Sequence, residues 1–399
     1  MKIMLIHPHI FAGGAERAVV YLAHHLNSLG HEAEICTLSI EPENLPRVAE
    51  GIQYILPEKP LWPRRIEGLR SSIKSVTAEV EALRRLIKKH VGDFDILSPC
   101  NFPSYWGTYP FRNLKPIVWV SSEAFGPYNE ARDIYDRSRT FRLATRAAAL
   151  LDRHIVRRSV DSIITCSDYN RRLIMERYGL EAWVNPTGVD YEFFSNPKGA
   201  EDKPLPEGFI LLQVGALVKR KNQLLSIRAL KRVREKLPEA KLIIVGKGPW
   251  EENLKEEAKR LSLEEDIIFK GQISEEELRN LYHNCDLNLY PVEEQTWGLV
   301  PFEALAAGRL SLVSENSGAG MIMKELGICY PINPSVEAIF KGVIEISKDP
   351  DRFREAIERG RKYIRENLTW EKYAERMAEA YRATFESFRP RVPRVASAW

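Results

Sequence analysis

A single acidic residue lies inside an apolar stretch in the second half of the chain. From Leu299 to Ala307 every residue except Glu303 is apolar, and a carboxylate inside a buried helix is costly unless it has a partner. Pro301 suits a first helical turn, so we expect a helix to start near Gly298 with free backbone N–H groups in front of it. Such a terminus attracts phosphate, and Glu303 can accept hydrogen bonds from sugar hydroxyls one turn behind it. The pattern predicts a sugar-nucleotide site at Gly298, Leu299, Val300 and Glu303; the alternative is a buried helix with a structural glutamate.

A glycine pair separates the first strand-like segment from the first helical one. Gly13 and Gly14 lie between KIMLIHPH and ERAVVYLAHHLNSLG. Glycine lets the backbone approach a ligand closely and tolerates positive φ. The pair has neither the Lys-Ser or Lys-Thr of a Walker loop nor the spacing of a dinucleotide-binding fingerprint. It indicates either a ligand-facing turn or a tight turn required by the strand-to-helix geometry.

Three cations follow the strand-like segment FILLQVGAL. Lys219, Arg220 and Lys221 are consecutive, and cations at the carboxyl end of a strand can hold a diphosphate and stabilise it as it departs. The alternative for each of them is a solvated surface charge.

Length and composition exclude several classes of protein. The chain has 399 residues, 44% hydrophobic and 28% charged, with a net charge of +3, which predicts two or three globular domains and no nucleic-acid partner. The five cysteines have no metal or redox spacing, so we expect no metal site and a reduced, cytoplasmic compartment. The sequence has no membrane-spanning run and begins directly with a predicted strand, Met1 to Ile10, in place of a leader.

Strand-like segments alternate with helical ones along the whole chain. This alternation predicts parallel sheets covered by helices, arranged as two doubly wound α/β domains with ligands outside the carboxyl ends of the strands. The linker-like stretch from Ser195 to Gly208 divides the chain into domains at 1–195 and 205–368. A helix over 369–388 either crosses back to the first domain or ends the second.

Five motifs together resemble a known family. In order they are HPHIFAGGAERAVVYLAHHLNSLGHE, VNPTGVDYEFF, VGALVKRKNQLLSIRAL, IIVGKGPWEENL and EEQTWGLVPFEALAAG. The chain resembles the retaining GT-B glycosyltransferases of family 4 (glycosyl transferases group 1, with hexosyl- and mannosyltransferases among them) over nearly its whole length. The resemblance implies two Rossmann-like domains facing across a cleft, the first for the acceptor and the second for a nucleotide sugar. It also implies that Gly13 and Gly14 face the donor pyrophosphate and that Glu303 binds the ribose hydroxyls.

The chain departs from the family pattern at three polar positions. The first of the family's paired glutamates, which contacts the transferred sugar, is Gln295; a loop shift would put Glu293 or Glu294 in its place. An arginine that commonly follows the strand's glycine is replaced by Ala216. A sugar-contacting histidine of many relatives is replaced by Ser122, with Glu123 beside it.

The resemblance implies transfer of a hexosyl group, mannosyl or glucosyl, from a nucleotide sugar to a sugar or lipid-linked acceptor with retention. No cofactor or metal is expected. The departing diphosphate accepts the acceptor's proton while Lys221, Arg220 and the helix terminus hold its charge, and Gln295 or Glu294 contacts the sugar. The alternatives are a noncatalytic GT-B subunit that binds a sugar nucleotide or glycan, and a sugar-nucleotide epimerase.

Basic segments in the first domain bear on the acceptor. From Arg132 to Arg158 there are eight Arg against three Asp, interleaved with apolar residues. This composition is typical of helices that lie on anionic membranes, and also of a solvated helix face. The first interpretation predicts a lipid-linked acceptor and peripheral contact with the inner face of the membrane.

Overall fold

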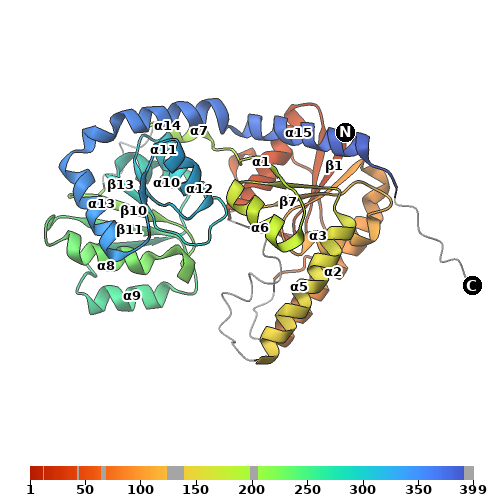
Figure 1. Ribbon diagram of the computed structural model, residues 1–399, viewed down its shortest axis with the longest axis horizontal. Coiled ribbons are helices and arrows are strands. Elements are labelled where there is room, and N and C mark those ends of the chain that lie inside the picture. Colours follow the sequence, from red (N-terminus) through yellow and green to blue (C-terminus); the bar gives the residue numbers. More distant parts are fainter. Residues whose placement is uncertain (12, 43–44, 64–68, 124–138, 198–204, 391–399) are drawn as a thin grey trace, which may run out of the picture. The chain divides into compact units, whose positions relative to one another are not determined.

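The protein forms two compact α/β units. The computed structural model describes residues 1–11, 13–42, 45–63, 69–123, 139–197 and 205–390. The first unit comprises Met1–Gly188 and the chain from Trp370 onward, and the second comprises Val189–Thr369 (Figure 1). Each is described below by itself.

Parallel strands form the centre of the first unit. One sheet has the order β5-β3-β1-β6 and another the order β7-β8-β9, and isolated bridges link Leu97 to Ile117 and Cys100 to Val120. The strands are β1 (Lys2–Ile6), β3 (Glu32–Cys36), β5 (Tyr54–Ile55), β6 (Ile96–Pro99), β7 (Val118–Ser121), β8 (Ser162–Thr165) and β9 (Trp183–Val184).

The predicted strand over Met1 to Ile10 is interrupted. It consists of β1 and a separate short strand, β2 (His9–Ile10), which pairs with β4 (Ser39–Ile40) instead of continuing the main sheet. Pro8 lies between them and has no backbone N–H to donate to a ladder, which favours a break at this point.

Helices of the first unit cover these sheets. They are α1 (Gly14–Ser28), α2 (Leu69–His90), α3 (Ser104–Thr108), α5 (Arg139–Ser159), α6 (Asp168–Tyr178) and α15 (Trp370–Ser387), with 3₁₀ turns at Arg47–Ala49, Val91–Asp93 and Tyr109–Phe111 (η2, η3, η4). Helix α3 packs against both α2 and α5. Among the described helices of both units, none is long and apolar enough to cross a bilayer.

A buried carboxylate ties α5 to its neighbours. Asp152 is fully buried, and it accepts hydrogen bonds from the Tyr105 and Tyr178 hydroxyls (2.8 and 2.7 Å) and from the Trp106 indole N–H (2.8 Å). Arg177 forms an ion pair with it at 3.1 Å. A buried charge needs such partners, and here they come from α3 and α6, so the position of α5 is fixed by this cluster.

The terminal helix α15 packs with the first unit, although it follows the second in sequence. The Tyr381 hydroxyl lies 2.7 Å from the Ser98 hydroxyl on β6. Asn185, after β9, donates to the Tyr373 carbonyl at 3.1 Å and accepts from Arg376 at 2.6 Å. These contacts join residues that are 188 to 283 positions apart in the sequence, and they close the first unit.

The second unit is a single six-stranded parallel sheet with the order β12-β11-β10-β13-β14-β15. Its strands are β10 (Ile210–Val214), β11 (Lys241–Val245), β12 (Ile267–Gly271), β13 (Leu287–Tyr290), β14 (Ser311–Ser314) and β15 (Tyr330–Ile332). The strand order reverses between β10 and β13, which is where doubly wound sheets bind ligands, outside the carboxyl ends of the strands.

Helices cover both faces of this sheet, with α8, α9 and α13 on one side and α10, α11 and α14 on the other (Figure 1). The described helices are α7 (Tyr191–Ser195), α8 (Gln223–Val233), α9 (Glu251–Arg260), α10 (Glu275–Asn284), α11 (Val300–Ala306), α12 (Gly318–Glu325), α13 (Val336–Lys348) and α14 (Arg354–Asn367), with 3₁₀ turns η5 (Lys219–Lys221) and η6 (Pro350–Phe353). The predicted parallel α/β class is confirmed.

Candidate functional site

Two of the three predicted cations converge on one amide oxygen. Turn η5 follows β10, and from it the Lys221 Nζ donates to Gln295 Oε1 at 2.7 Å while Arg220 donates to the same oxygen at 3.0 Å. The stem of Lys221 passes over Gly215, where an added Cβ would lie 3.7 Å from its Cδ and Cε. All three polar side chains are half-buried. Positive charge is therefore gathered at the switch point of the sheet.

Backbone hydrogen bonds fix the loop that carries Gln295. The Glu293 N–H donates to the Arg220 carbonyl at 2.9 Å, and the Gly318 N–H donates to the Gln295 carbonyl at 2.8 Å. Glu294, the alternative first acidic position, has a positive φ of 52° and an exposed side chain. In this register the side chain that contacts both Lys221 and Arg220 is Gln295.

Gly298 is required by its surroundings. Its φ is +152°, and a Cβ there would lie 1.9 Å from the Tyr290 hydroxyl oxygen, whose proton is donated to the Trp297 carbonyl at 3.3 Å. The helix begins at Val300 with Leu299 as its N-cap, not at Gly298. The reason is the conformation of Gly298, which is outside the helical region.

Glu303 is 3% exposed, and it has the partner that the sequence argument required. The Tyr282 hydroxyl, on α10, donates to Glu303 Oε2 at 3.0 Å. Tyr282 itself is fully buried. Tyr282 could not be predicted from the sequence, because the contact is tertiary and the spacing between the two residues gives no sign of it. This hydrogen bond stabilises the buried carboxylate, and it is compatible both with a sugar-nucleotide site and with a structural glutamate.

The glycine pair lies in the first unit and behaves differently from our expectation. Gly13 is the N-cap of α1 with a φ of −133°, an extended conformation, and Gly14 is the first helical residue. Gly13 therefore makes no use of the positive φ that glycine tolerates, and the ligand-facing role of the pair stays a prediction. A Cβ on Gly13 would meet the Glu16 carboxylate at 2.0 Å, the movable end of a side chain.

Ser122 and Glu123 follow β7, also in the first unit. The Ser122 N–H donates to Asn101 Oδ1 at 3.1 Å, and Asn101 has a φ of 61°. A cavity of about 20 Å³ brings Ser122 and Asn101 together with Ala15 from the start of α1. The carboxyl ends of β6 and β7 thus meet the first turn of α1. Asn101 was missed by the sequence analysis, although an asparagine directly after a buried strand was a usable signal.

No group of three or more His, Cys, Asp or Glu side chains is arranged to hold a metal ion among the residues described above.

Comparison with solved structures assigns the class of fold. The chain is similar to sucrose-phosphate synthase from Thermosynechococcus elongatus (20% identity, TM-score 0.76, covering 97% of this chain and 100% of the other). It is also similar to Anabaena HepE in complex with UDP-glucose (15%, 0.74, 96% and 100%) and to WaaG, a glycosyltransferase involved in lipopolysaccharide biosynthesis (18%, 0.71, 95% and 99%). The predicted GT-B fold class is confirmed.

Family comparisons then place the chain. The family model of glycosyl transferases group 1 matches residues 198–363, and that of glycosyltransferase family 4 matches residues 12–193. The chain belongs to the group 1 glycosyltransferase family, as the motifs predicted.

Relatives found by sequence share more identity with the chain, over shorter stretches. An uncharacterized glycosyltransferase of Methanocaldococcus jannaschii is 31% identical over 215 residues, 52% of this chain and 53% of the relative. Mannosylfructose-phosphate synthase of Agrobacterium fabrum is 23% identical over 341 residues, 78% of this chain and 74% of the relative. The chain spans between 53% and 58% of the length of the first curated relatives that it matches.

Proposed function

We propose that the protein transfers a hexosyl group from a nucleotide sugar to a lipid-linked sugar acceptor, with retention and without a metal ion. The observation that carries this proposal is the convergence of Lys221 and Arg220 on Gln295 at the switch point of the second unit. Lysine and arginine are the side chains that pair with diphosphate oxygens through charge-assisted hydrogen bonds, and here both are held at one point by the same amide oxygen.

The charge of the leaving group is the chemical problem that this cluster solves. When the bond between the sugar and the diphosphate breaks, negative charge develops on the diphosphate, and preorganised cations stabilise it most in a partly dry site. The diphosphate oxygen accepts the proton of the acceptor hydroxyl as that hydroxyl attacks the same face of the sugar. Gln295 contacts the sugar, and Glu303 binds the ribose at the beginning of α11.

Solved relatives support a nucleotide-sugar donor. HepE was crystallised with UDP, with UDP and glucose, and with UDP-glucose. Among sequence relatives, a mannosyltransferase of Mycolicibacterium smegmatis that is 28% identical over 234 residues is named as GDP-mannose-dependent and as acting on a phosphatidylinositol monomannoside. UDP-glucose and GDP-mannose are therefore the first donors to test.

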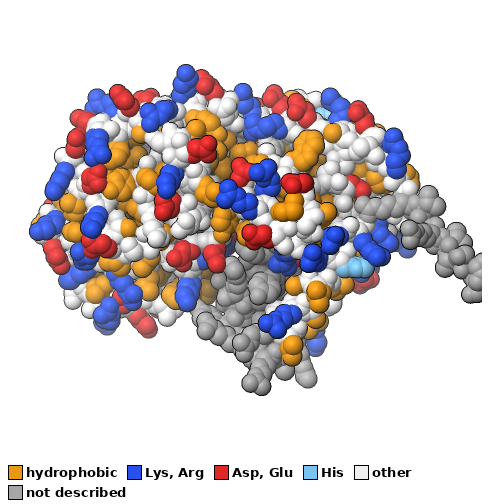
Figure 2. All heavy atoms as spheres, viewed as in Figure 1, with side chains coloured by type: hydrophobic (Ala, Val, Ile, Leu, Met, Phe, Trp, Pro, Cys, Tyr) orange, Lys and Arg blue, Asp and Glu red, His pale blue; other side chains and the backbone are white. Residues whose placement is uncertain are grey.

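The surface of the first unit supports a lipid-linked acceptor. Helix α2 carries six Lys or Arg against two Glu, and α5 carries six Arg against one Asp, in a chain whose net charge is only +3. Leu143 and Leu150 are 63% and 71% exposed on α5, and Figure 2 shows hydrophobic and basic side chains intermixed there. Apolar and basic residues combined in this way favour an anionic lipid surface.

The test is donor turnover by the purified full chain. UDP-glucose and GDP-mannose are incubated in EDTA with a short-chain glycolipid, and proton NMR follows both the donor and the anomeric configuration of the product. We expect nucleoside diphosphate release and retained configuration. Donor binding without release would support the noncatalytic alternative, interconversion of the donor sugar would support the epimerase, and an inverted product would contradict retention.

A further inference from the structure

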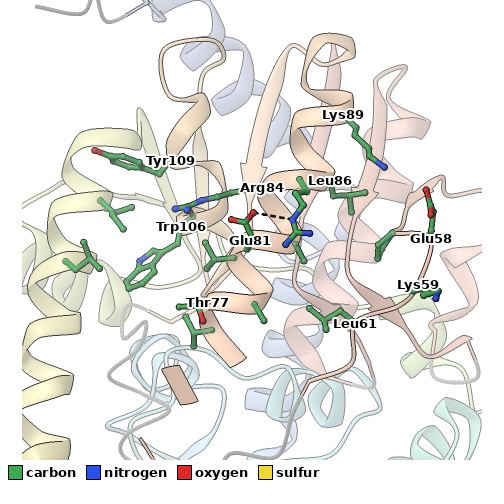
Figure 3. Close-up of a pocket in the computed structure, with 18 of the residues that line it drawn as sticks. Glu58, Lys59, Leu61, Thr77, Glu81, Arg84, Leu86, Lys89, Trp106 and Tyr109 are labelled. Carbon is green, nitrogen blue, oxygen red and sulfur yellow. Dashed lines mark hydrogen bonds and ion pairs between the residues drawn. The ribbon is translucent and has the colours of Figure 1, made fainter. Parts of the chain in front are cut away.

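A large groove lies along helix α2 in the first unit, whereas the candidate donor site belongs to the second unit. Its volume is about 1120 Å³, slightly above the usual range of roughly 300–1,000 Å³ for small-molecule sites. In Figure 3 Trp106 and Tyr109 lie at the left of the groove and Glu58 and Lys59 at the right, with Arg84 and Leu86 between them. We name it the α2 groove; it is lined by residues of the segment 57–61, of α2 from Val76 to Lys89, of α3 and η4 (Trp106, Tyr109), and of α5 from Leu151 to Ile155.

The helical period of α2 explains how one helix lines both sides. Thr77 and Arg84 are seven residues apart and share a face, and Ala78 and Ala82 share the next face, because residues three or four apart along a helix are neighbours. The first face turns toward Trp106, since Arg84 donates to the Trp106 carbonyl at 3.3 Å. The groove is therefore an apolar surface on either flank of one helix.

The wall of the groove is rigid. The Trp106 indole N–H is held by Asp152 at 2.8 Å, and Asp152 lies on α5 between two residues that line the groove, Leu151 and His154. The buried cluster around Asp152 thus fixes both the aromatic wall and the α5 wall. A preformed apolar site binds a chain at lower entropic cost than one that must order on binding.

Charge along the groove favours an anion. Four cations line it, Lys59, Arg84, Arg85 and Lys89, against two glutamates, of which Glu81 is already paired with Arg85 at 3.2 Å. The Nε of Arg84 is buried and has no hydrogen-bond partner within the described part of the chain. An anionic group placed beside Arg84 would pair with the half-buried guanidinium group, because guanidinium groups pair strongly with phosphate.

We propose that the α2 groove binds the hydrocarbon chain of a lipid phosphate, with the chain on the apolar flanks of α2 and the phosphate beside Arg84. The inference rests on the proposed function for the lipid's role as acceptor, while the binding itself is independent of glycosyl transfer. A free anion without a chain lacks the apolar contact, and a neutral amphiphile lacks the partner for Arg84.

Calorimetry on the full chain separates the contribution of the hydrocarbon chain from that of the phosphate. The probes are dodecyl phosphate below its micellar concentration, inorganic phosphate, and dodecyl maltoside. We expect saturable binding of dodecyl phosphate. Binding of the other two probes should be at least about tenfold weaker, since inorganic phosphate has no methylenes to bury and dodecyl maltoside forms no charged hydrogen bond. Equal binding of inorganic phosphate, or no binding of dodecyl phosphate, would overturn the proposal.

Variants locate the site. Ala82→Trp fills one flank of the groove, and Leu151→Glu places a like charge at a side chain that is 49% exposed, so the second variant leaves the core intact. Ala147→Trp is the matched control, because Ala147 is exposed on α5 and does not line the groove. We expect at least about tenfold weaker binding of dodecyl phosphate for the first two and unchanged binding for the control. Wild-type binding by Leu151→Glu would refute the location.

Two further measurements test the role of Arg84 and separate the groove from the nucleotide site. Arg84→Gln should reduce the preference for dodecyl phosphate over dodecyl maltoside by at least about threefold, because one of the four cations that line the groove is removed; an unchanged preference would contradict the role of Arg84. All variants should keep their thermal stabilisation by UDP, since the candidate nucleotide site lies in the second unit. If UDP does not stabilise even the wild type, the donor assignment fails while the groove result stands.

Discussion

Gln295→Glu tests whether the two cations of the second unit are the ones that a diphosphate uses. The new carboxylate would lie about where the amide oxygen is, 2.7 Å from Lys221 Nζ and 3.0 Å from the Arg220 guanidinium. At an effective dielectric of about 20, two charges 4 Å apart attract by roughly 4 kcal/mol. All three groups are half-buried, so desolvation and screening reduce the net gain to about 1–2 kcal/mol.

This gain stabilises the ligand-free state and is lost when a diphosphate takes the same cations. We therefore expect UDP to bind roughly 5–30-fold more weakly to Gln295→Glu, at about 1.4 kcal/mol per factor of ten. Titration calorimetry at two salt concentrations is the assay, and the variant should also show a weaker salt dependence of the UDP dissociation constant.

Gln295→Ala and Glu293→Gln complete the experiment. Gln295→Ala should leave UDP affinity within about threefold but slow transfer by 10-fold or more, because a charged hydrogen bond of about 1.5–3 kcal/mol no longer orients the cations. Glu293→Gln changes a neighbouring exposed carboxylate and should bind UDP slightly more tightly or not differently. UDP affinity that is unchanged or improved in Gln295→Glu would refute the reasoning.

Three predictions concern stability. Arg260 donates a hydrogen bond that lowers the pKa of Glu257 to about 2. Glu257 therefore stabilises the fold fully above its unfolded pKa of about 4.5, and this contribution is lost as the pH falls toward 2. Glu257→Gln should lower the free energy of unfolding by about 1–2 kcal/mol at pH 7 and make it depend less on pH in acid, and an unchanged acid transition would contradict this. Gly298→Ala should cost about 2–4 kcal/mol in urea unfolding through strain and overlap with the Tyr290 hydroxyl, and Tyr290→Phe in the same chain should recover part of the loss; absence of any cost would show that the loop relaxes. Asp152→Asn should cost about 3 kcal/mol by the same measurement, because it breaks a buried charged cluster, and a near-neutral effect would mean that the cluster is not needed.

Patterns along the chain predicted the architecture well. Parallel sheets follow from strands that alternate with helices, and the helix expected over the last residues, 369–388, is α15 at Trp370–Ser387. The apolar stretch around Glu303 predicted a short buried helix whose start was misplaced by two residues. The reason is local, because the φ of Gly298, +152°, lies outside the helical region and the apolar pattern does not predict it.

Tertiary contacts could not be predicted in the same way. The partner of Glu303 is Tyr282, on a helix that no periodicity connects to it. The sequence left open whether Gln295 or Glu294 faces the cations. The structure selects Gln295, whose backbone carbonyl accepts a hydrogen bond from the Gly318 N–H. Nor did the spacing of charges along α2 indicate a groove, because a groove requires the neighbouring α5 to be fixed at a distance by Asp152.

Lys221→Ala beside the wild type, with the donor that the wild type turns over, is the most direct test of the central claim. The measurement is the rate of sugar transfer together with the UDP or GDP dissociation constant. Because the leaving diphosphate gains charge in the transition state, we predict a turnover lower by about 10²–10³-fold and an affinity lower by no more than about tenfold. Undiminished turnover in the folded variant would contradict the account.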